Sequence, residues 1–300
     1  MKFPKAAKTF DEQLAILKGR GLVIPSDDEA IRWLKRVNYY RLSAYFAPFK
    51  QPLPSEDFHS GINFDRIVDL YVFDCRLRNL FMQAMERIEV SIRTAITYEL
   101  AHTYGPFAHT DPNSFSAWFL QPMKLGESPP FEELMGNILK EEKRTKEIFI
   151  KAYRQKYTTE EHLPIWMATE LMSFGTLSMM FEGLKSATKT KIAAQYKLAE
   201  RPFQNWLHVL SSIRNITAHH SRLWNRQLGV QAVIPHGWIH YVPKPDRTYC
   251  IAVMMQHLLS VIARGSQWRK RLIALIDLHP NVEVVAMGFP EDWRTRTPWV

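Results

Sequence analysis

Cysteine is scarce in this sequence, and long apolar runs are missing from it. Its two cysteines, Cys75 and Cys250, lie far apart and form no CxxC pair, so neither a disulfide framework nor a zinc module is predicted. No apolar run reaches the length of about 18 residues that a membrane helix needs, and the N-terminus lacks the apolar core of a signal peptide. We therefore expect a cytoplasmic protein with no membrane partner.

Sequence signatures of the common cofactor and metal sites are also missing. No GxxxxGK, GxGxxG or GxSxG motif occurs, which argues against nucleotide hydrolysis, dinucleotide redox chemistry and serine-hydrolase chemistry. His236 and His240 have a zinc-ligand spacing only on a helix, and the proline and glycine beside them argue against one. The adjacent His219 and His220 would point their rings apart. We expect no metal and no small-molecule cofactor.

The sequence is long and carries more positive than negative charge. The 300 residues carry a formal net charge of +9 and a pI of about 9.5. A chain of this length buries a substantial core, as one large domain or two smaller ones. Its basic character favours an anionic partner such as nucleic acid, although solubility alone is the alternative explanation.

Helical periodicity dominates the chain, and strand signals are few and brief, as at 282–286. The predicted class is therefore all-α. Helices are expected over 9–18, 26–48, 64–104, 131–157, 163–184 (interrupted at Gly175), 188–196, 202–226, 247–263 and 267–278. The first two begin at capping-box spacings, Thr9 with Glu12 and Ser26 with Glu29. Residues 1–50 are predicted to form an N-terminal helical lobe and residues 62–300 a helical domain with irregular insertions and a C-terminal helical extension, or the whole chain one continuous domain. A DNA-reading helix-turn-helix in the lobe is disfavoured, because its linker, 19–25, is too long.

The segment 214–226, RNITAHHSRLWNR, contains many polar and charged side chains next to an apolar helix face. An arginine is permanently charged and planar, which suits a phosphate, and a histidine exchanges protons near neutral pH. Arg214 and His219, or His220 as the alternative histidine, are the smallest set of side chains that could cut RNA without a metal. Asn215 is the fourth candidate catalytic residue. The competing interpretation is that these side chains hydrogen-bond within a helical bundle.

Helix geometry complicates this pairing. Arg214 and His219 lie roughly 140° apart on a straight helix, so they cannot point at one spot. Asn215, His219, Arg222 and Arg226 would instead share one stripe. Either the helix is distorted near Ala218, or the arginine of one subunit works with the histidine of another.

The predicted helix over 64–104 carries charges on its apolar face. Asp74 with Arg78, and Glu89 with Arg93, are four residues apart and can pair on the helix surface. Structural ion pairs are one interpretation. The other is that Glu89 or Asp74 supports the candidate site by orienting its arginine or histidine.

Several blocks of the sequence resemble the Abi-like abortive-infection proteins, the AbiD/AbiF group of bacteria. The blocks are NYYRLSAYFAPF, LYVFDCRLRNLFMQAMERIEVSIRTAI, LPIWMATELMSFGTLS, WLHVLSSIRNITAHHSRLWNR and the closing MGFPEDW. They follow one another in order over nearly the whole chain. The group is placed in the HEPN superfamily, so the resemblance implies a HEPN-like helical bundle.

HEPN proteins carry an Arg-x(4–6)-His motif, often with asparagine after the arginine, which here matches Arg214, Asn215 and His219. The resemblance implies a metal-independent endoribonuclease in phage defence, with RNA as substrate, a composite site in a homodimer, and a small structured RNA as inhibitor. The alternative is a non-catalytic HEPN module that binds RNA or protein in a defence or toxin–antitoxin system. The predicted RNA contacts are Arg222, Asn225, Arg226 and Arg41, the last of which is equally compatible with packing on the core.

Overall fold

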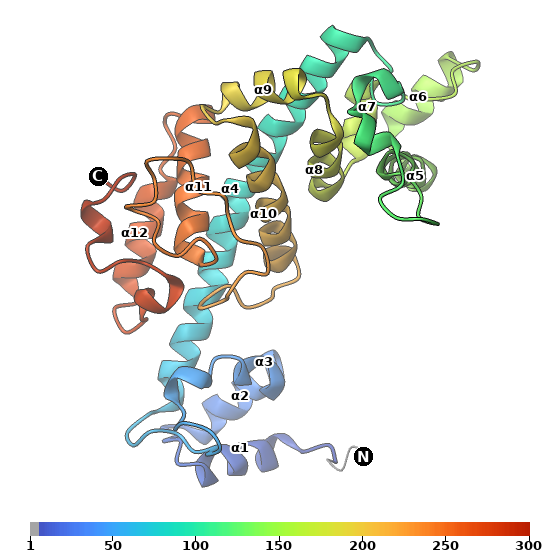
Figure 1. Ribbon diagram of the computed structural model, residues 1–300. Helices are drawn as coiled ribbons and strands as arrows, with labels where there is room; N and C mark the ends of the chain where they lie inside the picture. The colour runs from blue at the N-terminus through green and yellow to red at the C-terminus, as the bar shows by residue number, and fades with distance from the viewer. Residues whose placement is uncertain (1–5) are drawn as a thin grey trace.

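The structure, a computed structural model, describes residues 6–300 and is built from α-helices (Figure 1). These are α1 (Phe10–Gly19), α2 (Asp27–Val37), α3 (Tyr39–Ser43), α4 (Phe64–Tyr104), α5 (Pro130–Arg144), α6 (Ile148–Lys156), α7 (Ile165–Leu171), α8 (Phe174–Gly183), α9 (Ser186–Gln195), α10 (Glu200–Ala218), α11 (Thr248–Ile262) and α12 (Trp268–Leu278). Within the described residues only isolated β-bridges occur and no strand forms, so the all-α prediction is confirmed. The strand signal at 282–286 was wrong, because Val284–Met287 forms a 3-10 helix.

Helix α4 is the central element, and its 41 residues span about 60 Å. Asn63 caps its start by accepting a hydrogen bond from the Arg66 N–H, and Gly105, with φ of 88°, ends it. Helices α1–α3 lie at one end of α4 and α5–α8 towards the other, while α10 and α11 pack along its middle (Figure 1). The predicted helix over 64–104 is confirmed.

The N-terminal helices follow their predicted caps but not their predicted continuity. Thr9 and Glu12 form the expected capping box, and Ser26 accepts a hydrogen bond from the Glu29 N–H. The helix predicted to run to residue 48 ends at Val37, because Asn38 adopts a φ of 74° that no helix accommodates. The Asn38 side chain then caps α3.

Two further predicted helices are each split in the structure. The segment 131–157 forms α5 and α6, with an extended Thr145 at the break. The break predicted at Gly175 lies earlier, where Ser173 caps α8, and Gly175 is inside that helix. In residues 6–300 no helix combines the length and the apolar character needed to cross a membrane.

A buried histidine follows α4 and makes the fold sensitive to acid. Both ring nitrogens of His109 are buried without a hydrogen-bond partner, and burial lowers its pKa to about 4, with a smaller effect in the same direction from His162. Because the unfolded side chain has a pKa near 6.5, stability from neutral His109 is fully present above that pH. It is lost as the pH falls towards 4, at a cost of up to roughly 3 kcal/mol.

We expect this loss to appear as a fall in the free energy of unfolding, measured by urea titration, between pH 7 and pH 4. The variant His109→Phe keeps the volume of the ring and removes the titrating group, so its stability should depend less on pH. The matched control is His236→Phe, because His236 is exposed. A pH profile of His109→Phe that equals that of the unchanged protein would contradict the prediction.

Candidate active site at the end of helix α10

Helix α10 presents an apolar face to α4 and α8 and a polar face to solvent. The buried residues are Phe203, Trp206, Leu207, Val209, Leu210, Ser211, Ile213 and Thr217, most of which the periodicity predicted. Pro202 lies in the first turn, as expected for a residue without an N–H. The Thr217 hydroxyl is bonded to the Ile213 and Arg214 carbonyls and contacts the Met82 sulfur of α4. This packing fixes the helix on which the Arg-x4-His motif begins.

The helix ends earlier than the sequence predicted. His219 is its C-cap, the His220 N–H donates to the Thr217 carbonyl at 3.1 Å, and the Ser221 N–H donates to the Ile216 carbonyl at 2.9 Å. These two bonds form a Schellman motif, with His220 (φ 55°) in the left-handed position that glycine usually occupies. The chain therefore leaves the helix after Ala218. The predicted continuation to residue 226 was wrong.

The proposed stripe of side chains must be corrected for the same reason. Asn215 lies on the last turn of α10 and His219 caps it, but Arg222 and Arg226 belong to the irregular segment that follows. No hydrogen bond or ion pair joins Arg214 to His219 within residues 6–300. One alternative offered by the sequence was a distorted helix near Ala218. In the structure the helix ends at that residue instead.

Glu89 of α4 contacts the arginine of the motif. Its Oε2 lies 4.0 Å from the Arg214 Nε, and its Oε1 accepts a hydrogen bond from Arg93 at 2.9 Å. Arg93 also donates to the Met172 carbonyl at 3.0 Å. The carboxylate therefore lies between two guanidinium groups and keeps Arg214, which is 39% exposed, beside α4. This is the contact that the sequence proposed for Glu89.

Three polar side chains of the motif have no side-chain partner within residues 6–300. Asn215, His219 and His220 are exposed, and their side chains make no hydrogen bond with any other described residue. They are open to a ligand arriving from solvent, whereas the interpretation that they bond within the bundle receives no support from these contacts. Their catalytic roles stay predictions.

Asp74 supports the segment after the histidines rather than the motif itself. Its side chain is fully buried and accepts hydrogen bonds from the backbone N–H groups of Leu223 (3.2 Å) and Trp224 (2.7 Å). It also accepts bonds from the Tyr45 hydroxyl, at 2.6 Å, and from Arg78. Burial raises the pKa of the Asp74 carboxyl, and these four donors oppose that effect. The structure shows no contact between Asp74 and either Arg214 or His219.

Sequence reasoning found the Asp74–Arg78 pair but missed the other partners of the carboxylate. Tyr45 lies in the turn that follows α3, and Leu223 and Trp224 come 149 and 150 residues after Asp74. Backbone N–H groups leave no mark on a sequence, so no local signal could have identified them. We call Asp74 and its four donors the Asp74 network.

The predicted RNA contacts all have protein partners. The Arg41 guanidinium donates to the His220 carbonyl at 2.7 Å, and Arg222 donates to the Ala44 carbonyl. Arg226 donates to the Arg222 carbonyl at 3.3 Å, and the Asn225 side chain accepts from Arg247 at 3.1 Å. The first two bonds tie the motif's end to the N-terminal helices. An additional role in RNA binding stays a prediction.

Residues 6–300 contain no set of three or more His, Cys, Asp or Glu side chains that could hold a metal ion. Neither histidine of the motif is therefore part of a set of ligands large enough to hold a metal ion in the described chain.

Comparison with protein families identifies the class of this chain. The family model described as Abi-like protein matches residues 32–225, which is more than half of the chain, and the chain belongs to that family. Membership indicates a role in abortive-infection defence. The match extends from α2 to the segment after α10, so it includes α4, the Arg-x4-His motif and the Asp74 network. Neither the curated proteins nor the solved structures gave a match.

Proposed function

We propose that this Abi-like protein is a metal-independent endoribonuclease of the HEPN type. The observation that carries the proposal is the placement of the Arg-x4-His motif at the end of α10. There His219 is exposed and unpartnered among the described residues, and the Arg214 guanidinium lies 4.0 Å from the Glu89 carboxylate of α4. The basic net charge of +9 supports an RNA substrate. HEPN membership itself rests on the resemblance of the motif.

The residue types define a mechanism that needs no metal. His219 takes the proton from a ribose 2′-hydroxyl, and the 2′-oxygen forms a bond to the adjacent phosphorus. The bond from phosphorus to the 5′-oxygen breaks, and a second imidazole gives a proton to that oxygen. Arg214 neutralises charge that builds on the phosphoryl oxygens, and Asn215 positions the phosphate or fixes the imidazole tautomer. The products are a 2′,3′-cyclic phosphate and a 5′-hydroxyl.

The second imidazole comes from a second chain in this proposal. One chain has one motif, and no bond joins its Arg214 to its His219. A two-fold dimer places two motifs around one cavity, so that His219 of the partner subunit, or its neighbouring histidine, serves as the acid. The assembly is therefore proposed to be a homodimer. A small structured RNA is proposed to restrain the enzyme in the cytoplasm until infection.

A non-catalytic RNA- or protein-binding module is the second candidate. The observation in its favour is the same missing bond between Arg214 and His219, since a module that only binds needs no aligned pair. DNA reading by the N-terminal helices has less support, because α3 has only five residues and cannot fill a major groove.

We expect the purified protein to cut RNA in excess EDTA and to leave 2′,3′-cyclic phosphate ends. The reason is that the 2′-oxygen of RNA is the nucleophile and side chains carry both protons. Product ends are identified by their resistance to phosphatase before, but not after, acid opening of the cyclic ester. Cleavage that requires magnesium and leaves 5′-phosphates would refute the mechanism. Tight RNA binding without cleavage would favour the non-catalytic module.

A further inference from the structure

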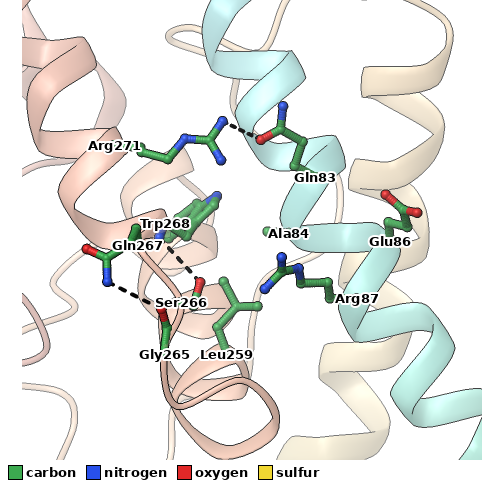
Figure 2. Close-up of a pocket in the computed structure, with 10 residues that line it drawn as sticks. All are labelled: Gln83, Ala84, Glu86, Arg87, Leu259, Gly265, Ser266, Gln267, Trp268 and Arg271. Atoms are coloured by element: carbon green, nitrogen blue, oxygen red, sulfur yellow. Dashed lines mark hydrogen bonds between the residues drawn. The ribbon is translucent and has the colours of Figure 1, made fainter.

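A polar cavity lies between α4 and the turn that leads into α12. Its volume is about 390 Å³, and ten residues line it (Figure 2). Ala84, Leu259 and Trp268 are buried and form its apolar base. The Trp268 indole N–H donates to the Leu80 carbonyl at 2.9 Å, which fixes the ring. We call this space the α4–α12 cavity.

Two guanidinium groups reach this cavity from opposite sides. Arg87 comes from α4 and makes no hydrogen bond or ion pair with any other described residue. Arg271 comes from α12 and donates to the Gln83 side-chain oxygen at 2.5 Å, a neutral partner. Figure 2 shows the Arg87 guanidinium directed towards the side of the cavity formed by Ser266 and Leu259. Within the described part of the chain, neither arginine forms an ion pair with a carboxylate.

The turn before α12 adds further donors. The N-cap residue of α12, Gln267, makes no capping hydrogen bond, so among the first-turn N–H groups only that of Trp268 has a side-chain partner within the described residues. The Ser266 Oγ accepts from the Trp268 N–H at 3.3 Å and keeps its own hydrogen for another acceptor. The positive end of an 11-residue helix dipole thus meets two arginines. Glu86 is the one acidic residue in the lining.

A second hollow continues from the first. It has a volume of about 520 Å³ and shares Glu86 and Arg87 with the α4–α12 cavity. Its other lining residues, Val90, Ser91, Ile262 and Ala263, are mostly apolar. We call it the adjoining groove. A ligand with a charged head and a flat, less polar body would fill both spaces.

We propose that the α4–α12 cavity binds the phosphate of a nucleotide unit, with the base in the adjoining groove. Arg87 and Arg271 bind the phosphate oxygens, and Ser266 donates to a third oxygen. Arg87 is about 160° around α4 from Glu89, the partner of Arg214. The site is therefore distinct from the candidate active site and does not depend on RNA cleavage. The nucleotide unit belongs either to a free nucleotide or to an RNA strand.

Calorimetric binding of inorganic phosphate, adenosine and AMP to the full chain tests the proposal. We expect AMP to bind more tightly than phosphate or adenosine, because only AMP fills both spaces. Arg87→Glu should weaken AMP binding by about tenfold or more, since it replaces an attractive charge with a repulsive one. Arg36→Glu is the matched control, because Arg36 is exposed on α2 and makes the same charge change elsewhere. It should leave AMP affinity unchanged.

A 2′-O-methyl RNA oligonucleotide, which cannot be cut through its 2′-oxygen, separates the two sources of the ligand. If Arg87→Glu weakens AMP binding and spares the oligonucleotide, the ligand is a free nucleotide. If Arg87→Glu weakens the oligonucleotide and AMP does not bind, the ligand is an RNA strand. Arg87 has no hydrogen-bond or ion-pair partner among residues 6–300, so this variant should keep the circular dichroism spectrum of the parent. If Arg87→Glu changes the affinity of neither ligand, the proposal is overturned.

Discussion

Replacing His219 by alanine is expected to lower the rate of RNA cleavage by about two to four orders of magnitude, the usual contribution of a general acid–base group. Arg214→Ala should cost about two to three orders, because the guanidinium stabilises charge that develops on the phosphate. The fold should be unchanged in His219→Ala. The His219 backbone N–H keeps its bond to the Asn215 carbonyl, and its side chain is exposed and unpartnered among the described residues.

Matched controls decide whether the loss belongs to the site. His208→Ala removes another exposed histidine of α10 and should leave cleavage within about twofold, as expected for a surface change far from the chemistry. His220→Ala distinguishes the two histidines of the motif. Full activity in His219→Ala with loss in His220→Ala would transfer the role to the neighbour. Full activity in both variants would place the chemistry elsewhere.

Mixing the Arg214→Ala and His219→Ala proteins tests whether the site is shared. In a mixed dimer one chain keeps its arginine and the other keeps its histidine. If the working pair forms between subunits, the mixture regains part of the activity that each variant lacks. If each chain's own pair works alone, or if all four groups are needed, no activity returns. A monomer that cuts RNA at its working concentration would contradict the shared site.

The sequence predicted those helices and helix ends that are determined by residues close together in the chain. The apolar periodicity of α10, the capping box of α1 and the bounds of α4 each follow from residues within one or two turns. The end of α10 was missed because His220 occupies a left-handed position that normally requires glycine or asparagine. Asn38, where α2 ends, also has a positive φ, of 74°.

The candidate site likewise has parts that the sequence predicted and parts that it did not. The Arg-x4-His spacing marks its residues, and the Glu89–Arg214 contact was proposed from the charges on the apolar face of α4. The surroundings of Asp74 were not predictable, because they depend on two distant segments meeting at one carboxylate. A backbone N–H of Leu223 is chemically the same as any other, so only the fold reveals that it is bonded to α4.

The Asp74 network is expected to be the largest single polar contribution to the stability of the described chain. Asp74→Ala leaves the Arg78 guanidinium and two backbone N–H groups buried without their acceptor. Breaking a buried ion pair in this way costs about 3–5 kcal/mol. We expect a fall of that size in the free energy of unfolding, measured by urea titration. Asp65→Ala, an exposed aspartate in the first turn of α4, should cost at most about 1 kcal/mol.

A smaller change at the same position separates stability from function. Asp74→Asn keeps the shape of the side chain but removes its charge and one acceptor, so the bonds to Leu223 and Trp224 should weaken while the core stays packed. Both N–H groups lie a few residues after His219. The intervening segment is also bonded to α3, because Arg41 donates to the His220 carbonyl. Freeing them should speed amide hydrogen exchange at 221–224 and lower RNA cleavage at temperatures where the variant is still folded. Faster exchange at these residues with unchanged cleavage would show that the network holds the fold together without positioning the histidines.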